Sequence, residues 1–347
     1  MFPENKWWAI AESKTIRNKP IGLRRLGEDL VLWRDLNGQI VCQSSLCAHR
    51  RANMALGRVN NGCIECPYHG FRYAPDGHCT FMPCEGKEAH ISPKMRIKTY
   101  VVREEHDLIW LWWGKEQAEY PPIPWFAHLL DRPMRWASGA VDWNVTFTRT
   151  AENLLLDIHH FSFLHRGVAN FFSLTSYTLL EIDEQRKDDD FFYFSGRLLP
   201  EEAGSDKESK ERFPLFQHWL RFPNMGLLDL AFGGMEFLVI VTPIDEENTW
   251  AYFRYYAQYI NTWISRWMSR LAAWIEINFI LPDDYKICLS LQPRHSSLSS
   301  LSLNKFVPAD EGIIIWHKQY DSLLHSEESI EGSDQQVVGA DSETFAK

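Results

Sequence analysis

Residues 47–49 read Cys-Ala-His, and after sixteen further residues, residues 66–69 read Cys-Pro-Tyr-His. Each stretch offers a thiol and an imidazole, so two neighbouring loops would bring two thiolates and two imidazoles together. That donor set suits a [2Fe–2S] cluster in which thiolates hold one iron and imidazoles hold the other. A structural zinc site is the alternative, but zinc sites typically group Cys with Cys and His with His. The pattern therefore favours a cluster bound by Cys47, His49, Cys66 and His69.

Short apolar runs separated by turns surround these loops. Residues 30–33 and 109–113 are rich in Leu, Ile and Trp, as buried strands are. Pro75-Asp76-Gly77 has turn chemistry, because Pro presets φ and Gly accepts a positive φ. We expect residues 1–118 to form a small all-β domain.

The rest of the chain mixes helical and strand-like segments, so the whole protein is expected to be α+β. A helical pattern begins near Thr150 and runs past His160, and residues from about 176 to 258 read as strands. A long helix is expected over Thr262–Phe279 and a final one from about Asp310.

These patterns divide the chain into three parts. The proline-rich residues 121–124 read as a stiff linker after the β domain. We assign residues 119–325 to a second domain. Residues 326–347 are acidic, polar and Ser-rich, and we expect them to be a disordered tail.

Tryptophans recur along the expected long helix. Four apolar side chains have helical spacing and two arginines fall off their face: Trp263, Trp267, Leu271 and Trp274, then Arg266 and Arg270. We expect the apolar face to pack into the core. A helix that lies on a membrane surface is the alternative. The charges in this stretch argue against a segment that crosses the bilayer.

The bulk composition excludes some classes of function. The 347 residues carry a net charge of −10 and the pI is about 5.7, whereas a nucleic-acid-binding protein needs a basic face. Seven cysteines, an odd number, come without a recognisable signal peptide. We therefore expect thiols or metal ligands in a reducing, cytoplasmic compartment and no disulfide framework.

A second histidine cluster lies in the first helical pattern. At about 100° per residue, Asn153, Asp157 and His160 share a helical face, and His159 points elsewhere. His160 and His165 are five residues apart, so the helix must end or bulge between them to align both. Two imidazoles with one carboxylate form the facial triad of non-heme Fe(II), which leaves coordination positions open.

Residues 2–86 resemble the Rieske domain of ring-hydroxylating and O-demethylating oxygenases. The resemblance rests on Leu26-Gly27-Glu28, Cys47-Ala48-His49-Arg50-Arg51 and Cys66-Pro67-Tyr68-His69-Gly70-Phe71-Arg72-Tyr73. Rieske proteins of respiratory complexes carry an additional disulfide beside the cluster, but here no Cys lies between His49 and Cys63. The resemblance is therefore to the oxygenase branch. It implies a catalytic domain of helix-grip, START-like fold, with a curved antiparallel sheet around the long C-terminal helix.

The same resemblance implies roles for individual residues. His160 and His165 would be iron ligands, and the acidic segment after Pro282 would supply the third, for which we choose Asp284 with Asp283 as the alternate. Asp157 would link an iron-bound His to a Rieske His, namely His69 or else His49, usually across a subunit boundary in a homotrimer. Asn153 matches a residue often found near the iron.

The resemblance further implies a Rieske monooxygenase or dioxygenase. Electrons from a ferredoxin or reductase, and indirectly from NAD(P)H, would reach a mononuclear Fe(II) through the cluster. With O₂ the enzyme would hydroxylate, demethylate or dihydroxylate a small aromatic or lipophilic substrate, which the sequence does not specify. The alternatives are a Rieske electron-transfer protein without oxygenase activity and a zinc-stabilised binding module.

Overall fold

The computed structural model describes residues 2–129, 135–167, 178–187, 191–200, 207–211, 213, 215–229, 234–257 and 262–338. Internal contacts divide the chain into two compact units. The N-terminal unit comprises Asn5–Ile123 and Thr242–Glu246, and the C-terminal unit comprises Met1–Glu4, Pro124–Val241 and Glu247–Lys347. The boundary after Ile123 falls inside the proline-rich segment that was predicted as a linker.

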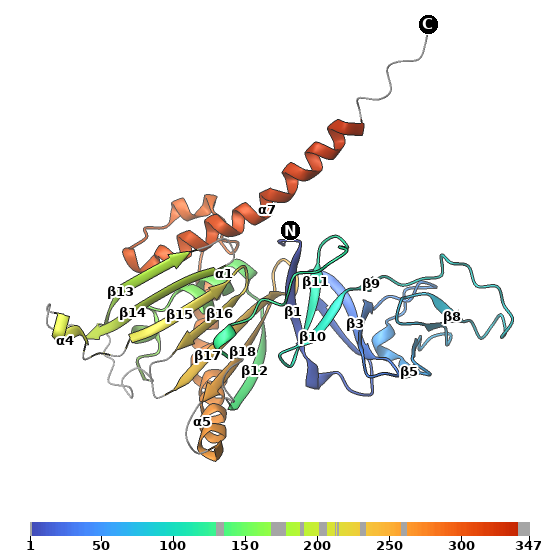
Figure 1. Ribbon diagram of the computed structural model, residues 1–347, viewed down its shortest axis with the longest axis horizontal. Helices are drawn as coiled ribbons and strands as arrows, with labels where there is room; N and C mark the ends of the chain where they lie inside the picture. Colours follow the sequence, from blue (N-terminus) through green and yellow to red (C-terminus); the bar gives the residue numbers. More distant parts are fainter. Residues whose placement is uncertain are drawn as a thin grey trace, which may run out of the picture. The chain divides into compact units, whose positions relative to one another are not determined.

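The N-terminal unit contains three antiparallel sheets, with strand orders β1-β11-β10, β2-β3-β4-β9 and β5-β6-β7-β8 (Figure 1). The strands are β1 (Lys6–Glu12), β2 (Ile21–Arg25), β3 (Glu28–Arg34), β4 (Ile40–Ser44), β5 (Arg58–Asn60), β6 (Cys63–Glu65), β7 (Arg72–Tyr73), β8 (Cys79–Phe81), β9 (Thr99–Tyr100), β10 (Val102–Glu105) and β11 (Leu108–Trp113). Two single-turn 3-10 helices connect them, η1 (Ser13–Thr15) and η2 (Met54–Leu56).

One buried cluster joins strands β3 to β8 to the loops with the predicted cluster ligands. Trp33 and Tyr73 are completely buried in it, and Cys47 and Cys66 belong to the same cluster. The indole N–H of Trp33 donates to Oε1 of Gln43 at 3.1 Å, so this buried donor is satisfied. The two ligand loops are thus anchored on a packed core.

The C-terminal unit is organised around a seven-stranded antiparallel sheet of order β12-β18-β17-β16-β15-β14-β13. The strands are β12 (Arg135–Trp143), β13 (Thr178–Lys187), β14 (Phe191–Pro200), β15 (Leu215–Arg221), β16 (Met225–Asp229), β17 (Met235–Pro243) and β18 (Thr249–Ala257). Every residue of β18 is buried, so both faces of the sheet are covered there. Such complete burial fits the aromatic composition of this strand, which reads TWAYFRYYA.

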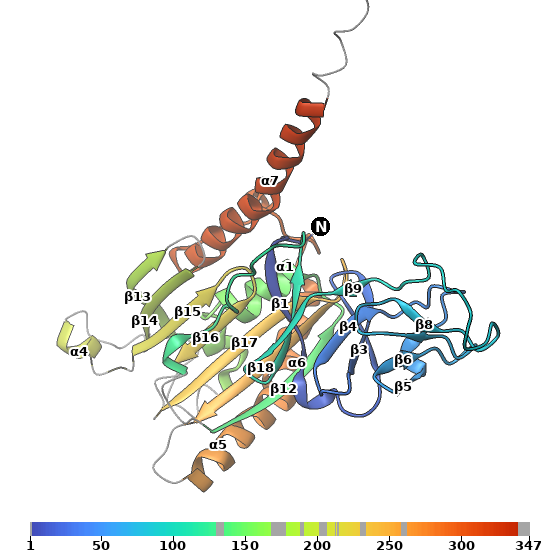
Figure 2. The same cartoon turned by 45° about the vertical axis from the view of Figure 1, so that its right-hand side comes forward.

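The helices of this unit include two π-helical stretches. The helices described in this unit are η3 (Ala127–Leu129), α1 (Phe147–Ala151), the π-helix η4 (Glu152–Leu156), α2 (Phe161–Leu164), α4 (Lys207–Glu211), α5 (Thr262–Ile275), the π-helix η5 (Glu276–Ile280), α6 (Leu281–Ser290), η6 (Ser299–Leu303), η7 (Pro308–Asp310) and α7 (Glu311–Val338). Helix α5 packs on β12 and β18 (Figure 2). Because α5, η5 and α6 are continuous, the predicted long helix extends beyond Phe279 to Ser290.

The face of α5 that packs on the sheet is not the predicted one. Trp263, Trp267 and Trp274 are 71%, 52% and 54% exposed, whereas Ser265 and Ser269 are buried. Small side chains allow a helix to approach a sheet closely, and the bulky indoles then have to point outward. The prediction that the apolar side with Trp263, Trp267 and Trp274 packs into the core is therefore wrong.

The last helix begins where the sequence predicted, next to Asp310. Trp316 in its second turn is buried and donates from its indole N–H to the carbonyl of Pro223 at 3.0 Å. The backbone remains helical to Val338, so residues 326–338 differ from the predicted disordered tail, and residues 339–347 lie outside the described part. A helix that packing has already nucleated gains one hydrogen bond for each residue added, which favours its extension.

Candidate metal centres

The two loops with the predicted cluster ligands repeat the same hydrogen bonds. In each loop, the backbone N–H of the Cys donates to the carbonyl of the residue five positions later, Ala52 or Phe71. The N–H of the residue four positions after the Cys, Arg51 or Gly70, donates to the carbonyl of the Cys. The N···O distances are 3.0 and 2.8 Å for the loop of Cys47, and 2.8 and 3.1 Å for the loop of Cys66. Arg51 and Gly70 occupy equivalent places and have positive φ values of 56° and 72°. Each loop is thus a tight turn held by its own backbone.

The thiols and imidazoles of these loops differ in exposure. Cys47 and Cys66 are buried, and burial raises the pKa of the Cys66 thiol. His49 is exposed and His69 half-buried, and their ring centroids are 4.8 Å apart. The hydroxyl of Tyr73 lies 3.2 Å from Sγ of Cys47. Two buried thiols beside two adjacent, accessible imidazoles fit the ligand set of a mixed-ligand [2Fe–2S] cluster, with the imidazole end open to partners.

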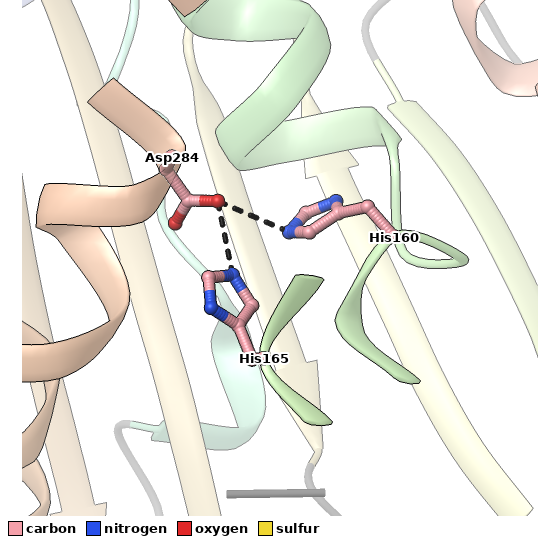
Figure 3. A group of neighbouring side chains, drawn as sticks. All are labelled: His160, His165 and Asp284. Carbon is pink, nitrogen blue, oxygen red and sulfur yellow. Dashed lines mark hydrogen bonds and ion pairs between the residues drawn. The ribbon is translucent and has the colours of Figure 1, made fainter. Parts of the chain in front are cut away.

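Three donor side chains converge in the C-terminal unit (Figure 3). The Nε2 atoms of His160 and His165 lie 3.3 and 3.0 Å from one carboxylate oxygen, Oδ1 of Asp284. Their ligand atoms all lie within 4.8 Å of one another. His165 and Asp284 are buried and His160 is half-buried. Two imidazoles and one carboxylate fit a non-heme Fe(II) site with open coordination positions.

The chain reaches this arrangement through a distorted helix. Helix α1 passes into the π-helix η4, and at Asp157 the backbone leaves helical geometry, with φ −87° and ψ 94°. After a turn, α2 follows and His165 caps its C-terminal end. The predicted single helix from Thr150 past His160 is therefore wrong, and the break precedes His160 where a break after it was expected. Wide π-turns of this kind often mark functional sites, because they re-aim the side chains that follow.

Both ring nitrogens of His160 face a carboxylate. Nδ1 lies 3.4 Å from Asp157 Oδ1, and Nε2 faces Asp284. Burial lowers the pKa of His160, but the adjacent carboxylates of Asp157 and Asp284 outweigh it and raise this pKa to about 10. Burial raises the pKa of Asp157, yet hydrogen bonds to His159 and His160 hold it well below its usual range. Nδ1 of His159 lies 2.9 Å from Asp157, and its Nε2 lies 3.6 Å from Asp310, away from the convergent donors.

The two acidic residues at the start of α6 have different surroundings. Asp284 is 2% exposed, and its Oδ1 is 3.5 Å from Nδ2 of Asn153. Asp283 instead pairs with the exposed Lys286 at 3.0 Å. The structure therefore brings Asp284 and Asn153 to the histidines and leaves Asp283 outside. The buried Oδ1 of Asn153 has no hydrogen-bond partner among the described residues, so this oxygen is an unsatisfied acceptor beside the donor set.

A buried ion-pair network holds η4 in place, and the sequence analysis missed it. Glu152 Oε2 accepts from Arg149 at 2.6 Å, and its Oε1 lies 2.6 Å from Nε2 of His317 on α7. Arg149 also donates to the carbonyl of Pro293 at 2.9 and 3.0 Å. Each buried charge thus has a partner, as burial requires. Arg149 and Glu152 are three residues apart, a spacing that pairs charges on a helix. Pro293 and His317 come from distant parts of the chain, so no local sequence pattern marks their contribution.

Glu276 is a second buried acid that the sequence analysis missed. Its Oε2 accepts a hydrogen bond from the Tyr255 hydroxyl at 2.7 Å. Burial raises the pKa of Glu276 to about 8, and the nearby negative charge of Asp284 raises it as well, against the hydrogen bond from Tyr255. A neutral carboxyl group therefore lies near the convergent donors at pH 7. The sequence offered one signal for the burial of Glu276. Glu276 follows Ser269 and Ala273 at helical spacing, and those two small residues are buried on the same side of the helix.

The N-terminal loops find their counterpart in a known family. Residues 6–101 match the Rieske [2Fe-2S] domain family. This part of the chain is a Rieske domain. All four residues predicted as cluster ligands lie inside the Rieske domain, and so do both hydrogen-bonded loops.

Curated relatives of the chain are components of oxygenase systems. The toluene-4-sulfonate monooxygenase system iron-sulfur subunit of Comamonas testosteroni is 33% identical over 169 residues, which is 48% of this chain and 47% of the relative. The dicamba O-demethylase oxygenase component of Stenotrophomonas maltophilia is 30% identical over 169 residues, 48% of this chain and 49% of the relative. The chain therefore matches about half the length of these relatives, and it is homologous to Rieske oxygenase components.

Solved structures resemble the chain over nearly its whole length. Dicamba monooxygenase bound to dicamba superposes with a TM-score of 0.77 at 19% identity, covering 94% of this chain and 98% of that one. NdmA of Pseudomonas putida CBB5 gives a TM-score of 0.72 at 20% identity, covering 94% and 92%. The predicted fold is thereby confirmed: a β Rieske domain precedes a domain with a large antiparallel sheet and a long C-terminal helix.

Proposed function

We propose that this chain is the oxygenase component of a Rieske non-heme iron system that hydroxylates, demethylates or dihydroxylates a small aromatic or lipophilic molecule. The observation that carries the proposal is the convergence of His160, His165 and Asp284 in a chain that also contains a Rieske domain. Relatives named as oxygenase components and demethylases support it.

The residues that would hold the two metal groups follow from the donor sets. Cys47, Cys66, His49 and His69 would bind the cluster, and His160, His165 and Asp284 would bind the mononuclear iron. When bound, the cluster supplies single electrons and the iron supplies the site at which O₂ is activated. Asp157 would orient the His160 ring through Nδ1, because carboxylates beside metal-bound imidazoles set their tautomer and direction.

We further propose that the chain works as a homotrimer in which Asp157 pairs with His69 of the partner subunit, or else with the partner's His49. Support comes from the exposure of the imidazole end of the Rieske loops and from the position of Asp157, a half-buried residue beside His160. Electrons would come from a ferredoxin or reductase, with NAD(P)H as their indirect source. A reducing, cytoplasmic location suits the seven free cysteines.

Metal analysis separates this proposal from a Rieske protein that only transfers electrons. Protein prepared anaerobically with iron and sulfide should contain about three irons and about two acid-labile sulfides per chain. His165→Ala should lose one iron and keep the sulfide and the cluster spectrum. About two irons in the wild-type protein, with the variant unchanged, would support the electron-transfer alternative.

A substrate screen tests the reaction class directly. The full-length protein would be incubated with a surrogate reductase, NADH and a panel of neutral and anionic aromatic compounds. We expect products that have gained one or two oxygen atoms or lost a methyl group. His165→Ala is the matched control, because it removes a proposed iron ligand and leaves the Rieske loops intact.

A further inference from the structure

The outer side of helix α5 carries aromatic and cationic side chains together. We call Trp263, Arg266, Trp267, Arg270 and Trp274 the tryptophan face. At about 100° per residue, its three indoles fall within roughly 40° of one another. Arg270 and Arg266 lie only about 20° and about 60° from Trp263, so the expectation that the arginines fall off this face was wrong. Figures 1 and 2 show α5 packed along the sheet. The three indoles are exposed whereas Ser265 and Ser269 are buried, so the tryptophan face lies on the side of α5 away from the sheet. This is the reverse of an ordinary amphipathic helix, whose large apolar side chains face the core.

The charge of the tryptophan face is positive and locally uncompensated. Arg266 and Arg270 are exposed, and neither makes an ion pair with a described residue. The acidic residue that follows on the same helical run, Glu276, is buried against Tyr255. Because the whole chain has a net charge of −10, two unpaired cations between tryptophans stand out from the rest of its surface. Their natural counterpart is an anionic surface.

The size of the face distinguishes between possible occupants. A Trp side chain has an area of up to about 250 Å², and the three indoles are 71%, 52% and 54% exposed. Together they therefore expose apolar area on the order of 400 Å². Exposed apolar patches of this size mark interaction sites. A stable protein dimer, however, buries about 800 Å² on each partner. A two-fold contact between copies of this face would also oppose their arginines. Area and charge therefore both disfavour a two-fold contact of this face with itself.

We propose that the tryptophan face docks on the surface of an anionic phospholipid bilayer, with α5 lying along the membrane plane. Indole rings prefer the headgroup level of a bilayer, because one edge is apolar and the N–H can donate a hydrogen bond. Arginines beside them would pair with lipid phosphates. None of the described helices is long and apolar enough to cross a membrane, so contact would be on one side only.

Vesicle flotation with the full-length protein tests this proposal. We expect binding to vesicles of phosphatidylcholine with about one third phosphatidylglycerol, and much weaker binding to pure phosphatidylcholine. Since each cation near an anionic surface contributes about 1 kcal/mol, which is about fivefold in binding, the double variant Arg266→Ser/Arg270→Ser should bind the mixed vesicles roughly 30-fold more weakly. The triple variant Trp263→Ser/Trp267→Ser/Trp274→Ser should lose binding to both kinds of vesicle.

Matched variants on other exposed sites control for general changes in charge and hydrophobicity. Arg17→Ser/Lys19→Ser removes two exposed cations, and Leu36→Ser/Leu303→Ser removes two side chains that are 78% and 71% exposed. Both should bind like wild type. The proposal fails if wild type does not float, or if the tryptophan variant floats equally well. A change of oligomeric state in the tryptophan variant, without a change in vesicle binding, would assign the face to a second copy.

Discussion

The two candidate metal centres of this protein are assembled over very different distances along the chain. The proposed Rieske ligands lie within residues 47–69, on two loops that repeat one hydrogen-bond pattern. At the second centre His165 meets Asp284, 119 residues further on, after the chain has passed through most of the large sheet. The first centre depends on local turns and the second on the packing of α6 against η4. Their sensitivities to substitution should differ accordingly.

Removal of a proposed iron ligand should have the largest effect and should be confined to one centre. Asp284→Ala deletes the only carboxylate within reach of both imidazoles in the described part of the chain. Changes beside a metal ligand already cost 10–100-fold in affinity, so we expect iron binding at this centre to weaken by more than about 100-fold. Metal analysis and the cluster spectrum measure both centres in one sample. Asp283→Ala, at the half-exposed neighbour that pairs with Lys286, should bind iron like wild type. Equal iron contents in the two variants would contradict the assignment.

Asp157→Asn should affect communication between the centres more than their metal contents. The amide keeps the size of the carboxylate but cannot hold the imidazoles of His159 and His160 with a negative charge. We expect reoxidation of the reduced cluster by O₂, followed by stopped-flow absorbance, to be about 10–100-fold slower. His159→Asn serves as the matched control, because it removes one imidazole partner and preserves the carboxylate. Wild-type reoxidation in Asp157→Asn would remove Asp157 from the electron path.

Glu276 makes the stability of the C-terminal unit dependent on pH. Burial raises its pKa from 4.5 to about 8, so between these values the folded state holds a proton that the unfolded state releases. Its contribution to stability is complete below the unfolded pKa and is lost as the pH rises through the folded pKa. Glu276→Gln keeps the acceptor for Tyr255 but has no proton to lose.

The test is urea unfolding at about pH 6 and about pH 9. Wild type should lose about 2 kcal/mol more stability across this interval than Glu276→Gln does. Glu246→Gln, at an exposed position, should follow wild type. Identical losses in wild type and Glu276→Gln would show that Glu276 is ionised throughout.

The smallest effects should come from the paired Rieske loops. Gly70→Ala places a Cβ at a φ of 72° and 3.1 Å from Cγ of Pro83, so it should cost about 1–2 kcal/mol. Arg51→Gly, at the equivalent position, relieves similar strain but adds freedom to the unfolded chain, so its net effect should be within about 0.5 kcal/mol. Chemical unfolding followed by cluster absorbance measures both. Equal costs would show that the two loops are not equivalent.

The sequence was most informative where the interactions are local. Spacing identified both Cys–His pairs, and helical spacing with the family resemblance led to His160 in preference to its neighbour His159. The reason for preferring His160 was nevertheless incomplete. The predicted continuous helix does not exist, and a π-turn and a break at Asp157 direct the side chain. The packing of α5 was predicted on the wrong side, because hydrophobicity says what prefers burial but not how closely a helix must approach a sheet.

The sequence by itself indicated the Rieske loops, since their proposed ligands, turns and positive-φ positions all lie within one short segment. It also determined the alternation of a β domain with an α+β domain, through the period of its apolar residues. Only the tertiary structure decided which acid meets the histidines, which face of α5 remains outside and which buried carboxyls have partners. Those outcomes depend on contacts between separate elements, such as His165 with Asp284 and Glu152 with His317, which are 119 and 165 positions apart. The packing of the whole unit sets the geometry of these contacts.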